Sequence, residues 1–336
     1  MSTKLTLLEL LTENTGTYIS GQEIADQLGI SRNSVWKAVK KLQDQGYEIE
    51  SMPSRGYRLV NTGDILSADY LKENIKHPCR ITVMEKTGST NNEAKAFKDL
   101  SLPQIVLANE QTGGRGRLGR TFHSPAGAGL YMSMAFQPDF SLDRAMLTTA
   151  MSAVAAARAI ERVTGLNPKI KWVNDIYLNG KKVCGILTEA ESNFETGRIE
   201  KIIVGIGVNC FEAALPEELK DIATYLENPQ KEFSRNELAA AIANEFFDML
   251  ADFNKVQMLR EYKSRSFILG EQIMIFNPAI ARSIGRPENR LSEGIRARAI
   301  DIDENGGLVI EFLEGRRSRE METLTTGEVT VRKGWE

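Results

Sequence analysis

A loop rich in glycine and arginine, residues 113–120, constrains the fold of this 336-residue chain more than any other sequence feature. Its glycines at 114, 116 and 119 match the dinucleotide-binding pattern G-x-G-x-x-G, and Arg120-Thr121 stands where a P-loop has Lys-Ser/Thr. Both motifs open directly into a helix whose N-terminus faces phosphate. Residues 121–129 contain one proline and two glycines, which disfavour a helix. We therefore expect neither a Rossmann-type site nor a P-loop.

What remains in the loop is a flexible backbone rich in amide donors, interleaved with Arg115, Arg117 and Arg120. Backbone amides and guanidinium groups both bond the oxygens of an anion. Because a charge-assisted hydrogen bond contributes about 1.5–3 kcal/mol, the arginines could dominate the binding of an acyl phosphate. The alternative is a mobile, solvated basic loop without a ligand. We disfavour it because its charges would be exposed with no balancing acids nearby.

Length and composition set broader limits. The chain exceeds the size at which one hydrophobic core keeps growing, so two or three domains are expected. The net charge of −3 gives no global signal for nucleic acid or a membrane, so any DNA binding must be local. The first residues lack a charged segment followed by a long apolar run, and no uninterrupted apolar run reaches about 18 residues. These features predict a cytoplasmic protein without a membrane partner.

Cysteine and histidine are scarce. The three cysteines are widely separated and favour neither a disulfide framework nor a zinc site, so no metal site is expected in the protein itself. With only His77 and His123 available, arginine, lysine and aspartate must carry any chemistry.

The first 62 residues follow the order of a winged helix-turn-helix. A first helix is predicted by apolar residues at helical spacing, namely Leu5, Leu8 and Leu11. Capping signals at Ser20–Glu23 and at Ser31 begin two further helices. Two alternating segments, residues 47–50 and 57–60, then predict strands whose connecting turn forms a wing.

The third of these helices is predicted to be a recognition helix. Val35, Val39 and Leu42 form its inner face. Its outer side and the wing carry the candidate DNA-binding residues: Arg32, Asn33, Trp36, Lys37, Lys40 and Arg55. Residues 31–58 hold six basic against three acidic side chains, and contacts of such residues to phosphate would make the affinity depend on salt. The alternative, a protein-interaction module with a solvated basic face, is disfavoured because helix, turn, helix and wing arrive in the expected order.

Polar clusters follow several predicted strands in residues 63–267. The strand at 81–84 leads to Ser89-Thr90-Asn91, and the strand at 105–111 leads into the glycine and arginine loop. Thr90 to Glu93 also fits a capping box, whose role would be structural only. Residues 201–209 form an apolar strand whose glycines permit close backbone approach, as in a pocket floor. Long helices are predicted over residues 142–164, mostly buried, and 234–256, amphipathic.

A predicted hairpin brings three polar residues together. The strand at 169–175 ends in Asn174-Asp175, and Asn179-Gly180 is a two-residue turn signal before the strand at 181–188. Asn174, Asp175 and Lys182 should therefore lie close to one another. A lysine beside an aspartate is most often a surface ion pair worth under about 1 kcal/mol. Near an arginine loop, however, the same pair could perform acid-base and phosphate chemistry.

Residues 268–336 are predicted to form a small β module. Short strands at 272–276, 295–301 and 308–312 are separated by glycine-containing turns, which favours a small barrel. Its arginines could help bind ATP or a protein substrate, but a solvated face is the preferred interpretation for Arg296, Arg298, Arg316, Arg317 and Arg319.

Taken together, the motifs resemble those of biotin protein ligases in order and spacing across most of the chain. They are Ser89-Thr90-Asn91, residues 113–120, residues 171–175, residues 180–187 and residues 205–209. With the winged helix in front, the chain resembles the bacterial family of bifunctional biotin protein ligases and biotin operon repressors. It departs from the family at Val173, where proline is usual, and in the polar stretch 277–293.

The resemblance implies an α+β multidomain fold. Residues 1–62 would form the winged helix-turn-helix DNA-binding domain. Residues 63–267 would form an α/β catalytic domain like that of class II aminoacyl-tRNA synthetases, and residues 268–336 an SH3-like β-barrel.

The resemblance also implies roles for individual residues. Biotin would be bound by Ser89, Thr90, Asn91, Gln111, Arg115, Gly116, Arg117 and Lys182. The adenylate would be bound by Arg117, Arg120, Phe122 and Asn174, with Phe122 standing where the family often has a tryptophan packed on adenine. Lys182, Asp175 and Arg117 would be catalytic.

The implied activity is ATP- and Mg²⁺-dependent ligation. Biotin would be activated to biotinyl-5'-AMP and transferred to a lysine of the biotin carboxyl carrier protein of acetyl-CoA carboxylase. Biotinyl-AMP would also be the corepressor that promotes a homodimer on operator DNA. One alternative is a lipoate-protein ligase, which would be expected to lack both the arginine-rich loop and the winged helix. The other is a ligand-sensing repressor without enzymatic activity, which would need neither Lys182 nor Asp175.

Overall fold

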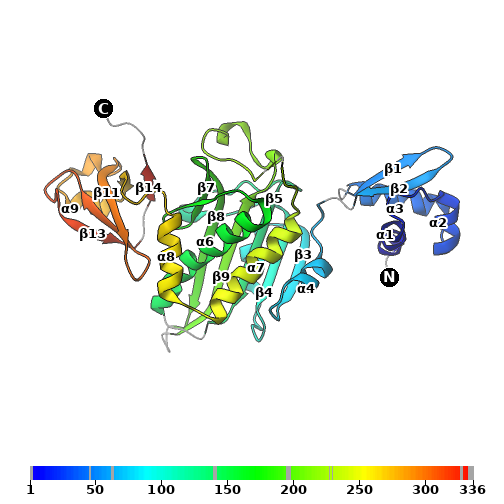
Figure 1. Cartoon of the computed structure of the whole chain (residues 1–336), viewed down its shortest axis with the longest axis horizontal. Helices are drawn as coiled ribbons and strands as arrows, with labels where there is room; N and C mark the ends of the chain where they lie inside the picture. The colour runs from blue at the N-terminus through cyan, green and yellow to red at the C-terminus, as the bar shows by residue number, and fades with distance from the viewer. Residues whose placement is uncertain are drawn as a thin grey trace. The chain divides into compact units, whose positions relative to one another are not determined.

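The computed structural model describes residues 3–44, 47–61, 64–138, 142–193, 198–226, 228, 230–325 and 328–331. The chain divides into two compact units (Figure 1). The N-terminal unit extends to Ser67 and includes Ser234–Asn236, and the larger unit contains the rest. Within the described residues, no helix combines the length and the apolar character needed to cross a membrane.

The N-terminal unit has the predicted order of three helices followed by a hairpin. The elements are α1 (Thr3–Glu13), α2 (Gly21–Leu28), α3 (Arg32–Asp44), β1 (Glu48–Met52) and β2 (Gly56–Asn61), and the two strands are antiparallel. The predicted caps are present. Ser20 Oγ accepts a hydrogen bond from the amide of Glu23, and Ser31 Oγ accepts one from the amide of Ser34.

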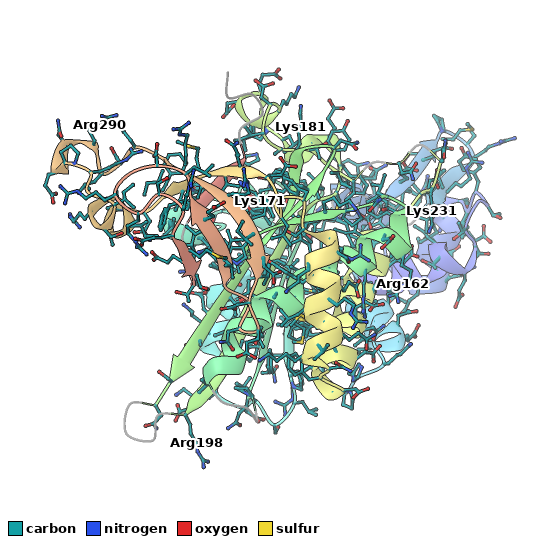
Figure 2. The ribbon with its side chains drawn as sticks, turned by 60° about the vertical axis from the view of Figure 1, so that its left-hand side comes forward. Arg162, Lys171, Lys181, Arg198, Lys231 and Arg290 are labelled. Carbon is teal, nitrogen blue, oxygen red and sulfur yellow. The ribbon has the colours of Figure 1, made fainter. Side chains whose placement is uncertain are left out.

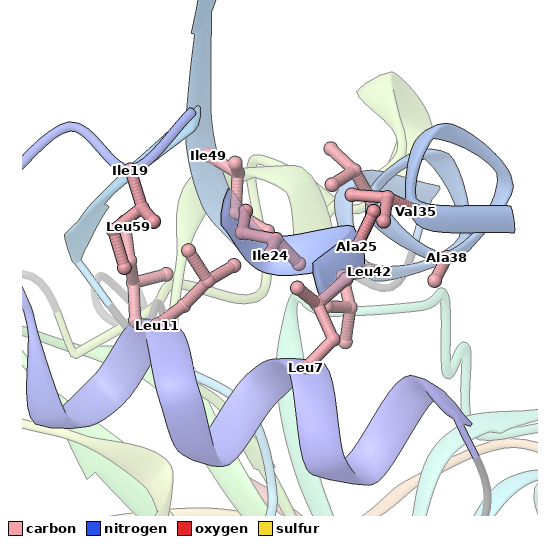
Figure 3. Packing of buried hydrophobic residues seen from close by; sticks show 11 residues of the cluster. Leu7, Leu11, Ile19, Ile24, Ala25, Val35, Ala38, Leu42, Ile49 and Leu59 are labelled. Atoms are coloured by element: carbon pink, nitrogen blue, oxygen red, sulfur yellow. The ribbon is translucent and has the colours of Figure 1, made fainter. Parts of the chain in front are cut away.

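The core of this unit includes two leucines of α1. Leu7 and Leu11 are buried against Ile24 and Leu42 (Figure 3), whereas Leu8 is only half-buried. The predicted first helix is confirmed by α1, and leucines occupy more than one of its faces, so the spacing alone does not select the most buried ones. The side chain of Leu5 lies outside the described residues.

The larger unit is built on a mixed sheet. In the described part of this unit, seven strands pair in the order β3 (Arg80–Thr87), β4 (Gln104–Gln111), β5 (Gly129–Phe136), β9 (Ile199–Asn209), β8 (Lys181–Ser192), β7 (Asp175–Leu178) and β6 (Lys169–Lys171). Strands β3 and β4 are parallel, and the other neighbours are antiparallel. All eight residues of β5 and eight of the eleven residues of β9 are buried, as expected for central strands covered on both faces.

Helices cover this sheet. The elements are α4 (Ala68–Asn74), α5 (Thr90–Ala96), α6 (Leu142–Thr164), α7 (Arg235–Ala251) and α8 (Lys255–Arg265). Figure 1 shows α6, α7 and α8 along one face of the sheet. The prediction that α6 is mostly buried is confirmed for its described side chains, and Gly165 follows its end at a φ of 72°.

The single helix predicted over residues 234–256 is wrong. The chain forms two helices instead, α7 and α8, which are separated at residues 252–254. Asn254 begins α8, where its side chain accepts a hydrogen bond from the amide of Gln257. Asparagine competes for backbone donors in this way, so it favours a helix start over a helix interior.

The C-terminal region contains the predicted strands and further elements. In its described part, strands pair in the antiparallel order β13 (Met321–Leu324), β12 (Leu308–Phe312), β11 (Ile295–Ile302), β10 (Gln272–Phe276) and β14 (Glu328–Val331). The polar stretch after β10 contains α9 (Pro278–Ser283), which begins at Asn277 and buries Ile280. Closure of these strands into an SH3-like barrel and the domain boundaries at 62/63 and 267/268 stay predictions.

Gly56 generates a stability prediction. It has a φ of 103°, and a Cβ added there would lie 2.0 Å from the backbone oxygen of Ile19. We expect Gly56→Ala to destabilise the N-terminal unit by more than about 2 kcal/mol, because a left-handed φ and a backbone overlap act together. Gly29→Ala is the matched control, since Gly29 has a φ of 63° but open space around it, and should cost about 1 kcal/mol. Native-state amide exchange of residues 3–61 in the full chain measures both, and equal effects would contradict the prediction.

Candidate functional site

A pocket of about 550 Å³ in the larger unit contains every residue for which a biotin, adenylate or catalytic role is predicted. These are Ser89, Thr90, Asn91, Gln111, Arg115, Gly116, Arg117, Arg120, Phe122, Asn174, Asp175 and Lys182. Lys171, at the end of β6, also lines the pocket and is labelled in Figure 2 together with Lys181 at the start of β8. The pocket therefore gathers cationic and amide side chains from segments far apart in the sequence.

The glycine and arginine loop is a closed, hydrogen-bonded turn. The amide of Phe122 donates to the carbonyl of Gly114 at 2.9 Å, and the amide of Gly116 donates to the carbonyl of Arg120 at 2.7 Å. A short 3-10 turn, η1 (Arg117–Gly119), forms its tip. Residues 120–128 are all described and contain no helix, so the exclusion of a P-loop and of a dinucleotide fingerprint is confirmed.

The arginines of the loop are held by neighbouring side chains. Nη2 of Arg115 donates to Oδ1 of Asn92 at 2.7 Å and lies 3.3 Å from Oε2 of Glu189. Nη1 of Arg117 donates to Oδ1 of Asn174 at 3.1 Å. Arg115 therefore has a balancing acid nearby, and the expectation of none was wrong for this residue. Glu189 is distant from Arg115 in sequence but adjacent in space.

The start of α5 is not the capping box that the sequence favours. The amide and the hydroxyl of Thr90 both donate to Oε1 of Gln111, at 2.9 and 3.1 Å. Glu93 instead accepts a hydrogen bond from the hydroxyl of Thr87 at 2.6 Å. Ser89 precedes the helix, and no side-chain capping bond is found for it in the described structure. The prediction failed because a side chain from β4 satisfies the first helical amide.

Glycines of β9 make room for two pocket residues. A Cβ at Gly205 would lie 2.1 Å from Oδ1 of Asn91, and a Cβ at Gly207 would lie 2.7 Å from the ring of Phe122. Any larger residue at either position would displace these side chains. This close approach agrees with the predicted pocket floor.

The hairpin of β7 and β8 brings Asp175 and Lys182 together, as predicted. Nζ of Lys182 lies 2.7 Å from Oδ1 of Asp175, and both side chains are partly buried. The turn residues Asn179 and Gly180 have positive φ values of 50° and 80°. Oδ1 of Asp175 is buried and has no hydrogen-bond partner among the described residues, so the contact is an ion pair without hydrogen-bond geometry.

The turn before Asp175 is supported by Tyr262, which the sequence did not indicate, and by Trp172, which lies in the motif of residues 171–175. The hydroxyl of Tyr262, on α8, donates to the carbonyl of Val173 at 3.1 Å, and Nε1 of Trp172 donates to the carbonyl of Gly306 at 2.9 Å. Burial raises the pKa of the Tyr262 phenol, and the negative charge of Asp175 raises it further, so the hydroxyl stays a donor. The Trp172–Val173 peptide bond is cis.

Further lining residues were also missed. They belong to the segment after β9 and are Leu215, Leu219, Ile222 and Ala223. The backbone of this segment joins the start of β8, since the amide of Lys182 donates to the carbonyl of Ile222 at 3.0 Å. The sequence signal that could have indicated them is the spacing of apolar residues within the acidic stretch 212–223.

The N-terminal unit presents the candidate DNA-binding residues on its surface. The predicted inner face of α3 is confirmed, because Val35, Val39 and Leu42 are buried. Trp36 is 54% exposed, an unusual value for a tryptophan. The other candidates are also exposed, namely Arg32, Asn33, Lys37, Lys40 and Arg55.

Known proteins match both units. Residues 80–209 match the biotin/lipoate A/B protein ligase family, and residues 3–58 match a helix-turn-helix domain. The bifunctional ligase/repressor BirA of Bacillus spizizenii and that of Bacillus subtilis are each 35% identical over 318 residues, which cover 92% of this chain and 94% of each relative. The biotin protein ligase from Aquifex aeolicus, solved in complex with biotin and ATP, is 28% identical and has a TM-score of 0.59 over 76% of this chain and 99% of that one. The chain therefore belongs to the bacterial family of bifunctional biotin protein ligases and biotin operon repressors.

Proposed function

We propose that the pocket converts biotin and ATP into biotinyl-5'-AMP and then transfers biotin to a lysine of the biotin carboxyl carrier protein of acetyl-CoA carboxylase. The observation that carries the proposal is the convergence of Arg117, Lys182 and Asp175 on one pocket with the polar side chains at the start of α5. A relative with a similar fold was solved with both biotin and ATP bound.

The first step needs cations. An oxygen of the biotin carboxylate attacks the α-phosphorus of ATP, and the bond from that phosphorus to pyrophosphate breaks. Two anions are brought together in this step, so cationic groups must stabilise the charge at phosphorus. Lys182, Arg117 and Arg120 are the side chains that supply this charge in the pocket.

The second step needs a base. The acceptor lysine must lose its proton before its nitrogen attacks the carbonyl of the mixed anhydride, and AMP then leaves. We assign the receipt of that proton to Asp175, because its carboxylate lines the pocket beside Lys182. Tyr262 and Trp172 hold the preceding turn and so fix the position of this carboxylate.

The remaining pocket residues would bind the substrates. Ser89, Thr90, Asn91 and Gln111 would bind the ureido end of biotin, and Arg115 and Gly116 of the loop line the same pocket. Phe122 lies close to Gly207, and its ring would pack on adenine. Asn174 is held by Arg117 and by the carbonyl of Ile186, close to the proposed adenylate.

We propose that Mg²⁺ enters the pocket bound to ATP. Among the described residues, no group of three or more metal-binding side chains could hold a metal on its own. Mg²⁺ in nucleotide sites typically binds one or two carboxylates together with substrate phosphates. Asp175 is the pocket carboxylate that can contribute, and the ion would neutralise phosphate charge.

We further propose that the N-terminal unit binds operator DNA through α3 and the wing. Biotinyl-AMP would act as corepressor, because ordering the loop on the ligand also lowers the entropy cost of forming a homodimer. A two-fold symmetric dimer presents two such units and suits a palindromic operator. Wild-type protein that dimerises and binds DNA equally well without biotin and ATP would contradict this part of the proposal.

The ligase proposal predicts one covalent product. With ATP, Mg²⁺, biotin and a carrier domain, the full chain should add the mass of one biotinyl group to the carrier lysine. Lipoate in place of biotin should give no addition. Lipoylation would indicate the lipoate ligase alternative, and no addition with either acid would indicate a repressor without enzymatic activity. Mass spectrometry of the carrier separates the outcomes.

Removing the proposed base should affect turnover far more than stability. We expect Asp175→Ala to slow biotin transfer by about 100-fold or more. Loss of the partly exposed ion pair with Lys182 should lower the free energy of unfolding by less than about 2 kcal/mol. Asp301→Ala is the matched control, since Asp301 pairs with Lys263 outside the pocket. Carrier biotinylation and denaturant unfolding measure the two effects, and unchanged turnover would remove the assignment.

Neutralising the outer side of α3 should weaken DNA binding. Lys37→Gln with Lys40→Gln removes two exposed charges, so the slope of log affinity against log salt should become shallower by about 2. Anisotropy of a labelled DNA duplex, with biotin and ATP present, measures this slope. Lys72→Gln, on α4, is the control and should leave it unchanged. A slope that stays the same in the double variant would place the DNA contact elsewhere.

A further inference from the structure

Glu189 lies behind the pocket and joins three elements. It belongs to β8, and its carboxylate contacts Nζ of Lys95 at 2.6 Å and Nδ2 of Asn91 at 2.8 Å, both from α5. The same carboxylate is 3.3 Å from Nη2 of Arg115 in the loop of residues 113–120. The Glu189 side chain is 23% exposed. One partly buried carboxylate therefore connects the sheet, the helix and the loop.

The partners of Glu189 include two pocket residues. Arg115 and Asn91 line the pocket, whereas Glu189 is not among the lining residues. Asn91 is fixed at both ends of its amide, because Ser133 Oγ donates to its Oδ1 at 2.6 Å and its Nδ2 donates to Glu189. Glu189 and Ser133 together thus fix the orientation of the Asn91 amide.

The charge of Glu189 strengthens these contacts. Burial raises the pKa of Glu189, but hydrogen bonds from Lys95 and Asn91, together with the charges of Lys95 and Arg115, outweigh burial and hold the pKa below its ordinary value. The carboxylate is therefore ionised near neutral pH. Hydrogen bonds to an ionised acceptor are shorter and stronger than neutral ones.

We propose that Glu189 is a positioning residue that ties the loop of residues 113–120 to the sheet through Arg115 and orients the amide of Asn91. The inference rests on the proposed function, because it concerns how long the pocket retains biotinyl-AMP. The mixed anhydride hydrolyses in water, so a loop held over it protects it until the carrier lysine arrives. Glu189 touches no reacting atom, so its loss should affect retention and binding rather than the adenylation step.

The test is Glu189→Gln in the full chain, which keeps the side-chain length and removes the charge. We expect biotinyl-AMP to dissociate about tenfold faster and the dissociation constant for biotin to rise by a similar factor. The single-turnover rate of adenylation at saturating substrate should stay within about twofold of wild type. Glu191→Gln is the matched control on the same strand, since Glu191 pairs with Lys201, and it should change neither quantity.

A double-mutant cycle with Arg115→Met identifies the contact responsible. If Glu189 acts through Arg115, biotinyl-AMP should dissociate from the double variant little faster than from Arg115→Met alone. Additive effects, or wild-type dissociation in Glu189→Gln, would overturn the inference. A fall in the adenylation rate with unchanged dissociation would also overturn it. If Glu189→Gln unfolds, the cycle is repeated with Glu189→Asp, which keeps the charge but shortens the reach. If wild-type protein forms no biotinyl-AMP, the proposed function fails instead.

Discussion

The pocket depends on holding several cationic side chains close together. Arg115, Arg117 and Lys182 all line it, and their mutual repulsion has to be offset within the protein. The fold supplies a separate partner for each one. Glu189 pairs with Arg115, the amide oxygen of Asn174 with Arg117, and Asp175 with Lys182. These contacts hold the cationic groups in fixed positions along the pocket lining, as preorganised charge stabilisation requires.

The pairing of β8 with β9 determines the shape of that space. Their antiparallel register places Gly185 opposite Gly207 and Leu187 opposite Gly205. The missing side chains at these glycines leave room for Asn91, Phe122 and Lys182 to approach the sheet. The floor of the pocket is therefore the backbone of two strands, and the residues that would contact substrate come from helix α5, the loop of residues 113–120 and the hairpin. Because a one-residue slip in register would reverse every side chain, this floor requires the register seen here.

The position of Asp175 depends on elements outside the sheet. The turn that precedes it is held by Tyr262 of α8 and by the carbonyl of Gly306, in the turn between β11 and β12. The C-terminal strands are consequently part of the support of the pocket and not merely an appended module. Salt bridges between helices reinforce α8, since Glu261 binds Arg158 of α6 as well as Arg265. Helix α8 and the turn between β11 and β12 thus help to fix the position of Asp175, which we propose as the base.

The sequence by itself determined the features that local chemistry encodes. Capping at Ser20, the hairpin turn at Asn179-Gly180 and the absence of a helix after Gly119 each depend on residues a few positions apart, and the structure agrees with all three. The roles assigned to individual pocket and DNA-binding residues remain proposals. A local pattern failed at Thr90 because a tertiary contact from Gln111 competes with it, and the helix predicted over residues 234–256 ends early because Asn254 begins a new helix. Only the tertiary structure revealed the contacts of Arg115 with Glu189, 74 residues away, and of Tyr262 with Val173, 89 residues away. Such pairs leave no periodic signal, because folding of the sheet, and not chain proximity, brings them together.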